Sequence, residues 1–253
     1  MIKRIAQWVL AILAMITFSA SPALACTATG FFRDGMNMTA ALVNPGTVSG
    51  TVTVPAEVNA TGCNIGVYYD QAGSISHANI YGANYYGLVV NGDSGDVNVD
   101  INNSTIHDIG EAPFNGAQHG VAIYYRALTL LTGSAFGNVE DNVLSEYQKG
   151  GIVVNGARAV VNTLGNIVTG LGPVNFIAQN GIQYGFGSNG TTRGNEISGH
   201  FYTGTVGVGP NPGGENPPGW EYFSAGLLLY QPGVVKHSKN FYADNQHNLA
   251  MIP

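Results

Sequence analysis

Charged residues are scarce in this chain of 253 residues, and the scarcity limits what it can bind. Only 9% of the residues are Asp, Glu, Lys or Arg, whereas about a quarter is usual in globular proteins. Nine basic residues stand against fifteen acidic ones, which gives a formal net charge of −6. Because nucleic-acid backbones are bound mainly by clustered Lys and Arg, the sequence excludes a nucleic-acid partner.

Long apolar runs are absent after the first 25 residues, which excludes a membrane span in the rest of the chain. The first segment carries Lys3 and Arg4, an apolar stretch over residues 5–18 and the ending Ala23-Leu24-Ala25. A short apolar run before a small-residue cleavage pattern is typical of a secretory signal peptide. We therefore predict a signal peptide at residues 1–25 and a secreted protein, located extracellularly, in a periplasm or on the cell surface.

Cysteine occurs only twice, at Cys26 and Cys63. Both lie in the part of the chain that we expect to be exported, and in an oxidising compartment they would most simply form a disulfide. Two buried free thiols are the alternative. Cys26 also directly follows the predicted cleavage point, so its lipidation is a further alternative, although Ala23 stands where a bacterial lipobox usually has leucine.

Glycine is abundant, with 36 residues, and six glycines each open a short run of mostly apolar or aromatic residues. Each run is followed, after a polar turn, by an asparagine. A unit repeated every 20 to 50 residues or so is typical of a solenoid, in which no single repeat buries its own apolar face. The glycines are Gly66, Gly87, Gly120, Gly151, Gly181 and Gly226, and the asparagines are Asn79, Asn103, Asn142, Asn166, Asn195 and Asn240.

The shortest spacing between two of these glycines, from Gly66 to Gly87, is 21 residues. That length suits one turn, or rung, of a right-handed parallel β-helix with three short strands. We therefore predict an all-β fold in which residues 26–253 form one right-handed parallel β-helix domain of about six to eight rungs. The longer spacings require loop insertions, expected at residues 110–117, 170–178 and 199–223, which emerge on one side of the solenoid, and around residues 128–137, which do not precede a repeated strand.

Alternation within each repeated strand predicts which side chains face the core. The first and third residues after each glycine are expected to point inward, and the second and fourth outward. The asparagines are expected to form a ladder that satisfies backbone groups of adjacent rungs. The inward residues are Val67, Leu88, Val121, Ile152, Ile182 and Leu227, together with Tyr69, Val90, Ile123, Val154, Tyr184 and Leu229.

Three phrases in the chain resemble those of secreted bacterial right-handed parallel β-helix repeat proteins, within the pectate-lyase-like superfamily. They are Gln118–Tyr124 (QHGVAIY), Tyr147–Ile152 (YQKGGI) and Gly170–Gln183 (GLGPVNFIAQNGIQ). The resemblance covers roughly residues 63–248 and implies the β-helix fold. The superfamily includes polysaccharide lyases, polygalacturonases, epimerases and adhesins, so the resemblance favours a carbohydrate partner but assigns no activity.

The catalytic constellations of that superfamily are missing from the sequence. A calcium-dependent lyase needs several carboxylates on the outer strand face, where we expect only Asp70. The six histidines are scattered, and no spacing of His, Cys or Asp is typical of a zinc site. We therefore predict no metal site and no cofactor.

One polar cluster remains as a candidate catalytic site, because His119 and Lys149 precede repeated strands on consecutive rungs. His119 could accept a proton, while Lys149 or Arg126 neutralises a uronate carboxylate, with Glu111 or Tyr124 close by. The alternative is a ladder of glutamines that leaves His119 and Lys149 exposed on a turn. We favour this second interpretation and treat the four residues as candidates only.

Aromatic and amide side chains on the expected outer face suggest a glycan site. Tyrosine and tryptophan rings stack on sugars, while amides and carboxylates bind hydroxyl groups. Alternatively, Trp220 pins its own loop to the solenoid. The expected ligand-binding residues are Asp70, Asn91, Tyr124, Asn155, Gln183 and Trp220.

The function that we predict is non-catalytic binding of a polysaccharide or other glycan, or a role at the cell surface or in a matrix. Two alternatives stay open. One is a polysaccharide lyase or epimerase that acts on uronic-acid polymers, and the other is a structural, self-assembling solenoid.

Overall fold

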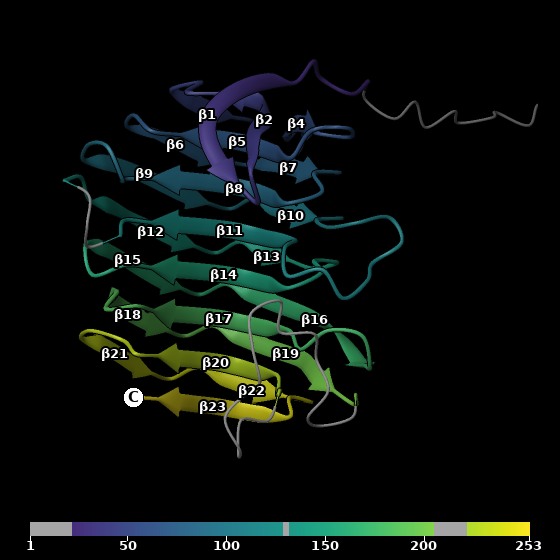
Figure 1. Cartoon of the computed structure of the whole chain (residues 1–253), viewed down its shortest axis with the longest axis vertical. Helices are drawn as coiled ribbons and strands as arrows, with labels where there is room; N and C mark the ends of the chain where they lie inside the picture. Colours follow the sequence, from purple (N-terminus) through teal and green to yellow (C-terminus); the bar gives the residue numbers. More distant parts are fainter. Residues whose placement is uncertain (1–21, 129–131, 205–221) are drawn as a thin grey trace, which may run out of the picture.

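The computed structural model describes residues 22–128, 132–204 and 222–253. Every regular element in these ranges is a β-strand, and the strands form three sheets that we name A, B and C. From β2 onward the chain visits A, B and C in turn, so that neighbours within a sheet lie three strands apart along the chain (Figure 1). The predicted all-β fold with parallel strands is thereby confirmed.

The three sheets run the length of the molecule. Pairing is parallel throughout the described strands except between β1 and β2. In spatial order, sheet A consists of β1 (Thr27–Arg33), β2 (Met36–Val43), β5 (Ile65–Tyr69), β8 (Tyr86–Asn91), β11 (Val121–Arg126), β14 (Gly150–Asn155), β17 (Asn180–Gly185), β20 (Ala225–Tyr230) and β23 (His247–Ile252). Sheet B consists of β3 (Thr47–Ser49), β6 (Gly73–Ser76), β9 (Val97–Asn102), β12 (Ala135–Glu140), β15 (Ala159–Leu164), β18 (Asn189–Arg193) and β21 (Val235–Ser238). Sheet C consists of β4 (Ala56–Asn59), β7 (Ala78–Tyr81), β10 (Thr105–His107), β13 (Val143–Leu144), β16 (Ile167–Val174), β19 (Glu196–Tyr202) and β22 (Phe241–Ala243).

The repeated glycines lie where sheet A packs against side chains of sheet C. A Cβ atom on Gly87 would lie 2.7 Å from Cγ2 of Ile106 and 2.5 Å from the carbonyl oxygen of Ala122. On Gly151 it would lie 2.5 Å from Cγ1 of Val168. Contacts this short leave no room for a side chain, which is why a glycine opens most of the repeated strands.

The strand β11 departs from the predicted register. Ile123 pairs with Leu88 on one side and with Ile152 on the other, so Ala122, not Gly120, occupies the place of the repeated glycine. The prediction that Val121 faces the interior was wrong, because Val121 packs in the apolar cluster on the outer face of sheet A. Gly120 instead has φ +86°, a turn conformation that glycine adopts without strain.

Replacing Gly87 with alanine is expected to lower the free energy of unfolding by about 2 kcal/mol, since the added methyl group overpacks the junction of sheets A and C. Denaturant unfolding measures the change. The matched control is Gly95→Ala, because a Cβ atom on Gly95 meets nothing within 4 Å. Equal effects of the two substitutions would show that the repeated glycine is not a packing requirement.

The predicted asparagine ladder is confirmed for Asn142, Asn166, Asn195 and Asn240. Each side-chain oxygen accepts a hydrogen bond from the backbone N–H of the preceding member, at 3.0 or 3.1 Å. For Asn142 the donor is the N–H of Ser104. On that rung, serine takes the place of the asparagine. The prediction was therefore wrong for Asn103 and Asn79, whose amides lie outside the ladder: the Asn79 amide contacts two side chains of sheet C.

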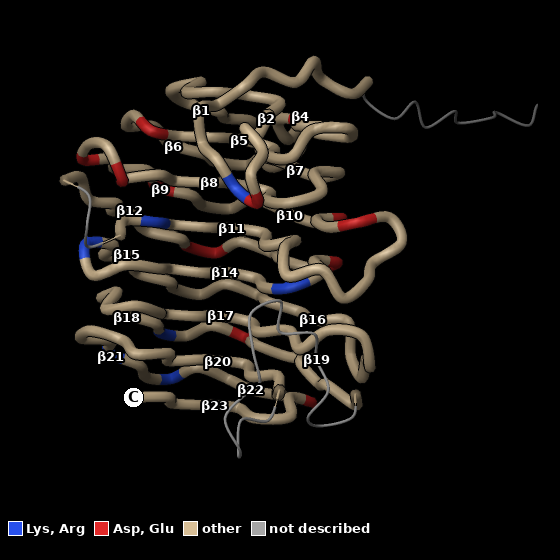
Figure 2. The backbone as a smooth tube through the Cα atoms, viewed as in Figure 1, with Lys and Arg blue, Asp and Glu red and all other residues tan. Residues whose placement is uncertain are grey.

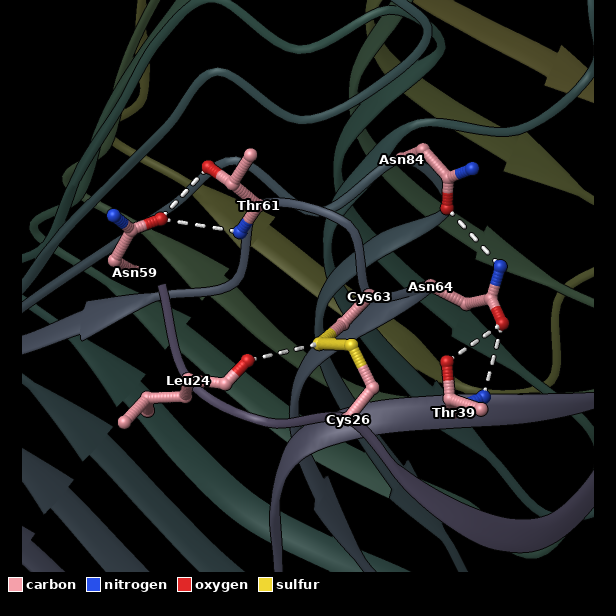
Figure 3. The surroundings of a disulfide bond; sticks show 8 residues. All are labelled: Leu24, Cys26, Thr39, Asn59, Thr61, Cys63, Asn64 and Asn84. Carbon is pink, nitrogen blue, oxygen red and sulfur yellow. Dashed lines mark hydrogen bonds between the residues drawn. A yellow bond between two sulfur atoms is a disulfide. The ribbon is translucent and has the colours of Figure 1, made fainter. Parts of the chain in front are cut away.

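The predicted disulfide joins Cys26 to Cys63 (Figure 3), across 37 residues and a Cα–Cα distance of 5.4 Å. It anchors the hairpin formed by β1 and β2, which folds over the outer face of β5 and β8 (Figure 1). Phe31 of this hairpin stacks on Tyr68 at a centroid distance of 6.2 Å and also contacts the ring of Tyr86. The N-terminal half of sheet A is thus covered by the chain itself.

Of the predicted signal peptide, residues 1–21 lie outside the described part of the chain. In the described part, no helix is long and apolar enough to cross a membrane. Lys and Arg residues lie apart from one another along the solenoid (Figure 2).

Candidate functional site

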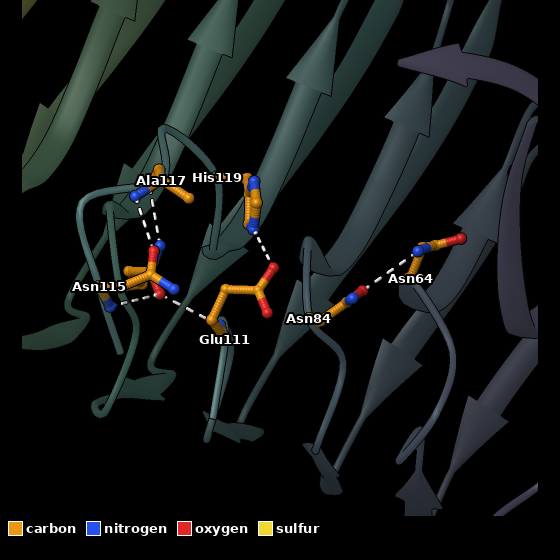
Figure 4. A network of polar contacts seen from close by, with 7 residues as sticks. Asn64, Asn84, Glu111, Asn115, Ala117 and His119 are labelled. Atoms are coloured by element: carbon orange, nitrogen blue, oxygen red, sulfur yellow. Dashed lines mark hydrogen bonds and ion pairs between the residues drawn. The ribbon is translucent and has the colours of Figure 1, made fainter. Parts of the chain in front are cut away.

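His119 and Glu111 come together in the loop between β10 and β11 (Figure 4). Nε2 of His119 lies 2.7 Å from Oε1 of Glu111, and the imidazole stacks on the ring of Tyr85 at a centroid distance of 3.8 Å. The His119 side chain is only 10% exposed, so the expectation that it lies exposed on a turn was wrong, whereas the Glu111 side chain is 36% exposed. A carboxylate only accepts hydrogen bonds, so in neutral His119 Nε2 carries the proton and Nδ1 is left as the basic nitrogen. The predicted proximity of Glu111 to His119 is confirmed.

Lys149 and Arg126 do not complete this site. The backbone N–H of Lys149 donates to the carbonyl of Gly120, but its ammonium group donates to the carbonyl of Ala178 at 2.7 Å, on the following rung. Burial lowers the pKa of Lys149 to about 8. His119 contacts the preceding rung through Tyr85, so the two side chains bond in opposite directions along the solenoid.

Arg126 lies at the opposite end of β11 from His119, about 20 Å away by strand length. Its Nε donates to a carboxylate oxygen of Asp93, and its guanidinium lies 5.3 Å from the ring centre of Phe31. Burial alone would lower the pKa of Arg126, but the hydrogen bonds and charges of Asp93 and Tyr124 together outweigh burial, and the pKa is raised. We interpret Arg126 as an anchor for the β1–β2 hairpin.

Arg33, at the tip of the β1–β2 hairpin, is a cation close enough to affect Tyr85, the ring on which His119 stacks, and sequence reasoning missed it. The pKa of Tyr85 is raised, first by burial and then by the charges of Asp34 and Glu111, while Arg33 opposes the rise. The hairpin tip and the loop that carries Glu111 therefore both lie near Tyr85. No local signal could have revealed this, because the residues meet only through folding of the hairpin over sheet A.

Two of the predicted ligand residues lie buried beneath the β1–β2 hairpin. Tyr124 is 6% exposed and stacks on Tyr86 at a centroid distance of 5.2 Å. The amide of Asn91 donates to the hydroxyl of Tyr68 at 3.0 Å. The ring face of Tyr124 and the amide of Asn91 therefore already have protein partners in this fold.

The remaining predicted ligand residues are more dispersed. Asp70 is exposed and accepts a hydrogen bond from the Asn44 amide at 2.6 Å. Asn155 and Gln183 are half-buried on adjacent strands, and Oδ1 of Asn155 is buried without a hydrogen-bond partner in the described chain. Trp220 lies outside the described residues. The structure thus does not gather this predicted set into one site.

A groove on the outer face of sheet C is a cavity that sequence reasoning did not anticipate. It has a volume of about 340 Å³ and lies between the loop after β3 and the first residues of β7, β10 and β13. Its walls combine hydroxyl, amide, imidazole and carboxylate groups with a few apolar side chains. The lining residues are Thr51, Val52, Pro55, His77, Ala78, Asn79, Asn103, Ser104, Thr105, Asp141 and Val143.

Comparisons with known proteins found no match: no protein-family model matches this chain, and neither a curated protein nor a solved structure matches it.

Proposed function

We propose that this protein is exported, adopts a right-handed parallel β-helix of the pectate-lyase-like kind, and binds a glycan without catalysis in the groove on sheet C. Parallel strands joined by crossovers are right-handed in nearly all proteins, which supports the handedness. The disulfide supports export, because such bonds persist mainly outside the cytoplasm. A role at a cell surface or in a matrix is compatible with the same binding.

The groove itself carries the proposal. Asn103 and Thr105 come from one rung and Asp141 from the next, about 4.8 Å away, so that donors and acceptors lie in rows along the solenoid. Val143 and Pro55 add apolar surface for the faces of sugar rings. The lining contains a carboxylate and no Lys or Arg, so it suits neutral sugars better than uronic acids.

Retention on immobilised neutral polysaccharides tests the proposal. Val143→Arg places a long side chain in the groove and is expected to weaken retention at least tenfold. Val160→Arg is the matched control, because both valines are 41% exposed on the outer faces of their sheets, and it should leave retention unchanged. Equal retention of the two variants would overturn the groove as the site.

Absence of retention for the unmodified protein on every glycan tested would overturn glycan binding altogether. If such a protein also formed ordered oligomers, the structural solenoid would become the preferred function. Circular dichroism of both variants should match the unmodified protein, since both substitutions lie on exposed positions.

A second candidate function, a lyase or epimerase on uronic-acid polymers, is favoured by one observation: the 2.7 Å contact that orients His119 against Glu111. Arg33 would be the cation for the uronate carboxylate. A panel of uronic-acid polysaccharides decides between the candidates, with absorbance of the unsaturated product as the readout for a lyase and proton NMR of the two uronate epimers as the readout for an epimerase. We expect no product; product that disappears with His119→Gln would make the protein a lyase.

A further inference from the structure

His107, Asp108 and Glu146 form a cluster at the carboxyl end of β10, on the outer side of sheet C. Nδ1 of His107 lies 2.8 Å from Oδ2 of Asp108 and 3.8 Å from Oε2 of Glu146. The three ligand atoms all lie within 4.8 Å of one another. Asp108 and Glu146 belong to adjacent rungs, whose backbones are joined at this point by the hydrogen bond from Ile109 N–H to the Glu146 carbonyl.

A relay of hydrogen bonds from outside the cluster sets the proton position on His107. The carboxylate of Glu57 accepts a hydrogen bond from the amide nitrogen of Asn79 at 2.9 Å, which turns the Asn79 oxygen the other way. That oxygen lies 3.1 Å from Nε2 of His107, and because it can only accept, Nε2 must carry the proton. The ring is also held by stacking on Tyr81, at a centroid distance of 5.2 Å and an interplanar angle of 11°.

This arrangement directs the lone pair of Nδ1 in the neutral ring at two carboxylate oxygens. Three acceptors that face one another repel unless a cation lies between them. The cation is either a second proton on His107 or a bound metal ion. Histidine ligands in metal sites usually donate their other ring N–H to an oxygen acceptor, as His107 does to Asn79.

We propose that His107, Asp108 and Glu146 bind one divalent transition-metal ion, with Zn²⁺ the best fit. Zn²⁺ bonds of about 2.0–2.2 Å in a tetrahedral site put ligand atoms about 3.4 Å apart, between the two separations seen here. One imidazole and two carboxylates suit Zn²⁺ or Mn²⁺ better than Ca²⁺, which prefers oxygen ligands throughout. The carboxylate side chains are 58% and 60% exposed, so water can complete the coordination.

From the sequence we predicted no metal site, and the proposed Zn²⁺ site differs from that prediction. The histidines are scattered along the chain, and Glu146 lies far from His107 in sequence. Only the stacking of two rungs brings the three side chains together. The inference does not depend on glycan binding, although Asn79 also lines the groove on sheet C.

Titration calorimetry with ZnCl2, MnCl2 and CaCl2 tests the proposal on the full chain without a histidine tag, after treatment with a chelator. We expect one Zn²⁺ per chain, bound at least tenfold more tightly than Ca²⁺. Asp108→Asn and Glu146→Gln should each weaken Zn²⁺ binding at least tenfold. Asp108 has φ 52°, a conformation that asparagine tolerates, so this variant retains the turn.

Two further variants separate this site from adventitious binding. Asn79→Ala removes no ligand but releases the His107 ring, and should weaken Zn²⁺ binding about tenfold. His237→Ala removes an exposed histidine on β21 and should change nothing. Absence of Zn²⁺ binding, or binding unaffected by Asp108→Asn and Glu146→Gln, would overturn the proposal and leave a doubly protonated His107 as the cation.

Discussion

Replacement of both Cys26 and Cys63 with alanine is expected to lower the free energy of unfolding by about 4 kcal/mol. The disulfide closes a sequence separation of 37 residues. In the chain-entropy treatment, removal of the disulfide raises the conformational entropy of the unfolded chain and so stabilises the unfolded state. Urea unfolding of the variant and of the oxidised protein, at the same pH and temperature, measures the difference.

The same substitution should loosen the β1–β2 hairpin, because the disulfide lies at the start of β1 (Figure 3). Hydrogen exchange in β1 is expected to accelerate more than in β14, which lies several rungs away. Reduction of the unmodified protein with a thiol should reproduce both effects. A loss of stability below about 1 kcal/mol would show that hairpin packing, with Phe31 at its centre, holds the N-terminus without the bond.

Acidification from pH 6.5 to pH 4 is expected to lower the free energy of unfolding by about 3 kcal/mol through His200 alone. Burial lowers the pKa of His200 from 6.5 to about 4. Between these values the unfolded chain binds a proton that the folded chain does not, so stability falls as the pH falls. The contribution is fully present above pH 6.5 and is lost as the pH approaches 4.

Hydrogen bonds explain why His200 is neutral in the fold. Oδ1 of Asn245 accepts from Nδ1 of His200 at 2.9 Å, while the Asn245 amide nitrogen donates to the carbonyl of Ile197. Nδ1 therefore carries the proton, and Nε2 accepts from the hydroxyl of Tyr147 at 2.5 Å. Both ring nitrogens are occupied in a fully buried site, so a second proton has neither a place nor solvent to stabilise its charge.

Unfolding free energies measured across this pH range for the unmodified protein and for His200→Asn test the prediction. The variant should be less stable near neutral pH but show a shallower acid dependence. His237→Asn is the matched control, because His237 is exposed and its replacement should leave the slope unchanged. Identical slopes for the unmodified protein and His200→Asn would assign the acid sensitivity to carboxylates instead.

The candidate sites show where local sequence patterns reach their limit. Glu111 was expected near His119 because both lie in one short loop, and their contact confirms it. Lys149 was expected beside His119 from rung spacing alone, yet its ammonium group bonds to Ala178 on the next rung. Spacing along the chain places a backbone on a rung, but the direction of a long side chain depends on which carbonyls are near it.

Periodic features of the chain were determined by the sequence itself. Most of the repeated glycines and the asparagines Asn142, Asn166, Asn195 and Asn240 occur at the same place on successive rungs, and two cysteines allow only one disulfide. Such signals are reliable because each rung must satisfy the same packing and hydrogen-bonding demands as its neighbours.

Non-periodic contacts were decided only by the tertiary structure. The β1–β2 hairpin buries Tyr124, the register of β11 places Ala122 where a glycine was expected, and the stacking of two rungs brings Glu146 to His107. Each of these depends on segments that are distant in sequence and occur once. A single contact between distant residues leaves no repeated pattern along the chain, so only the folded backbone reveals it.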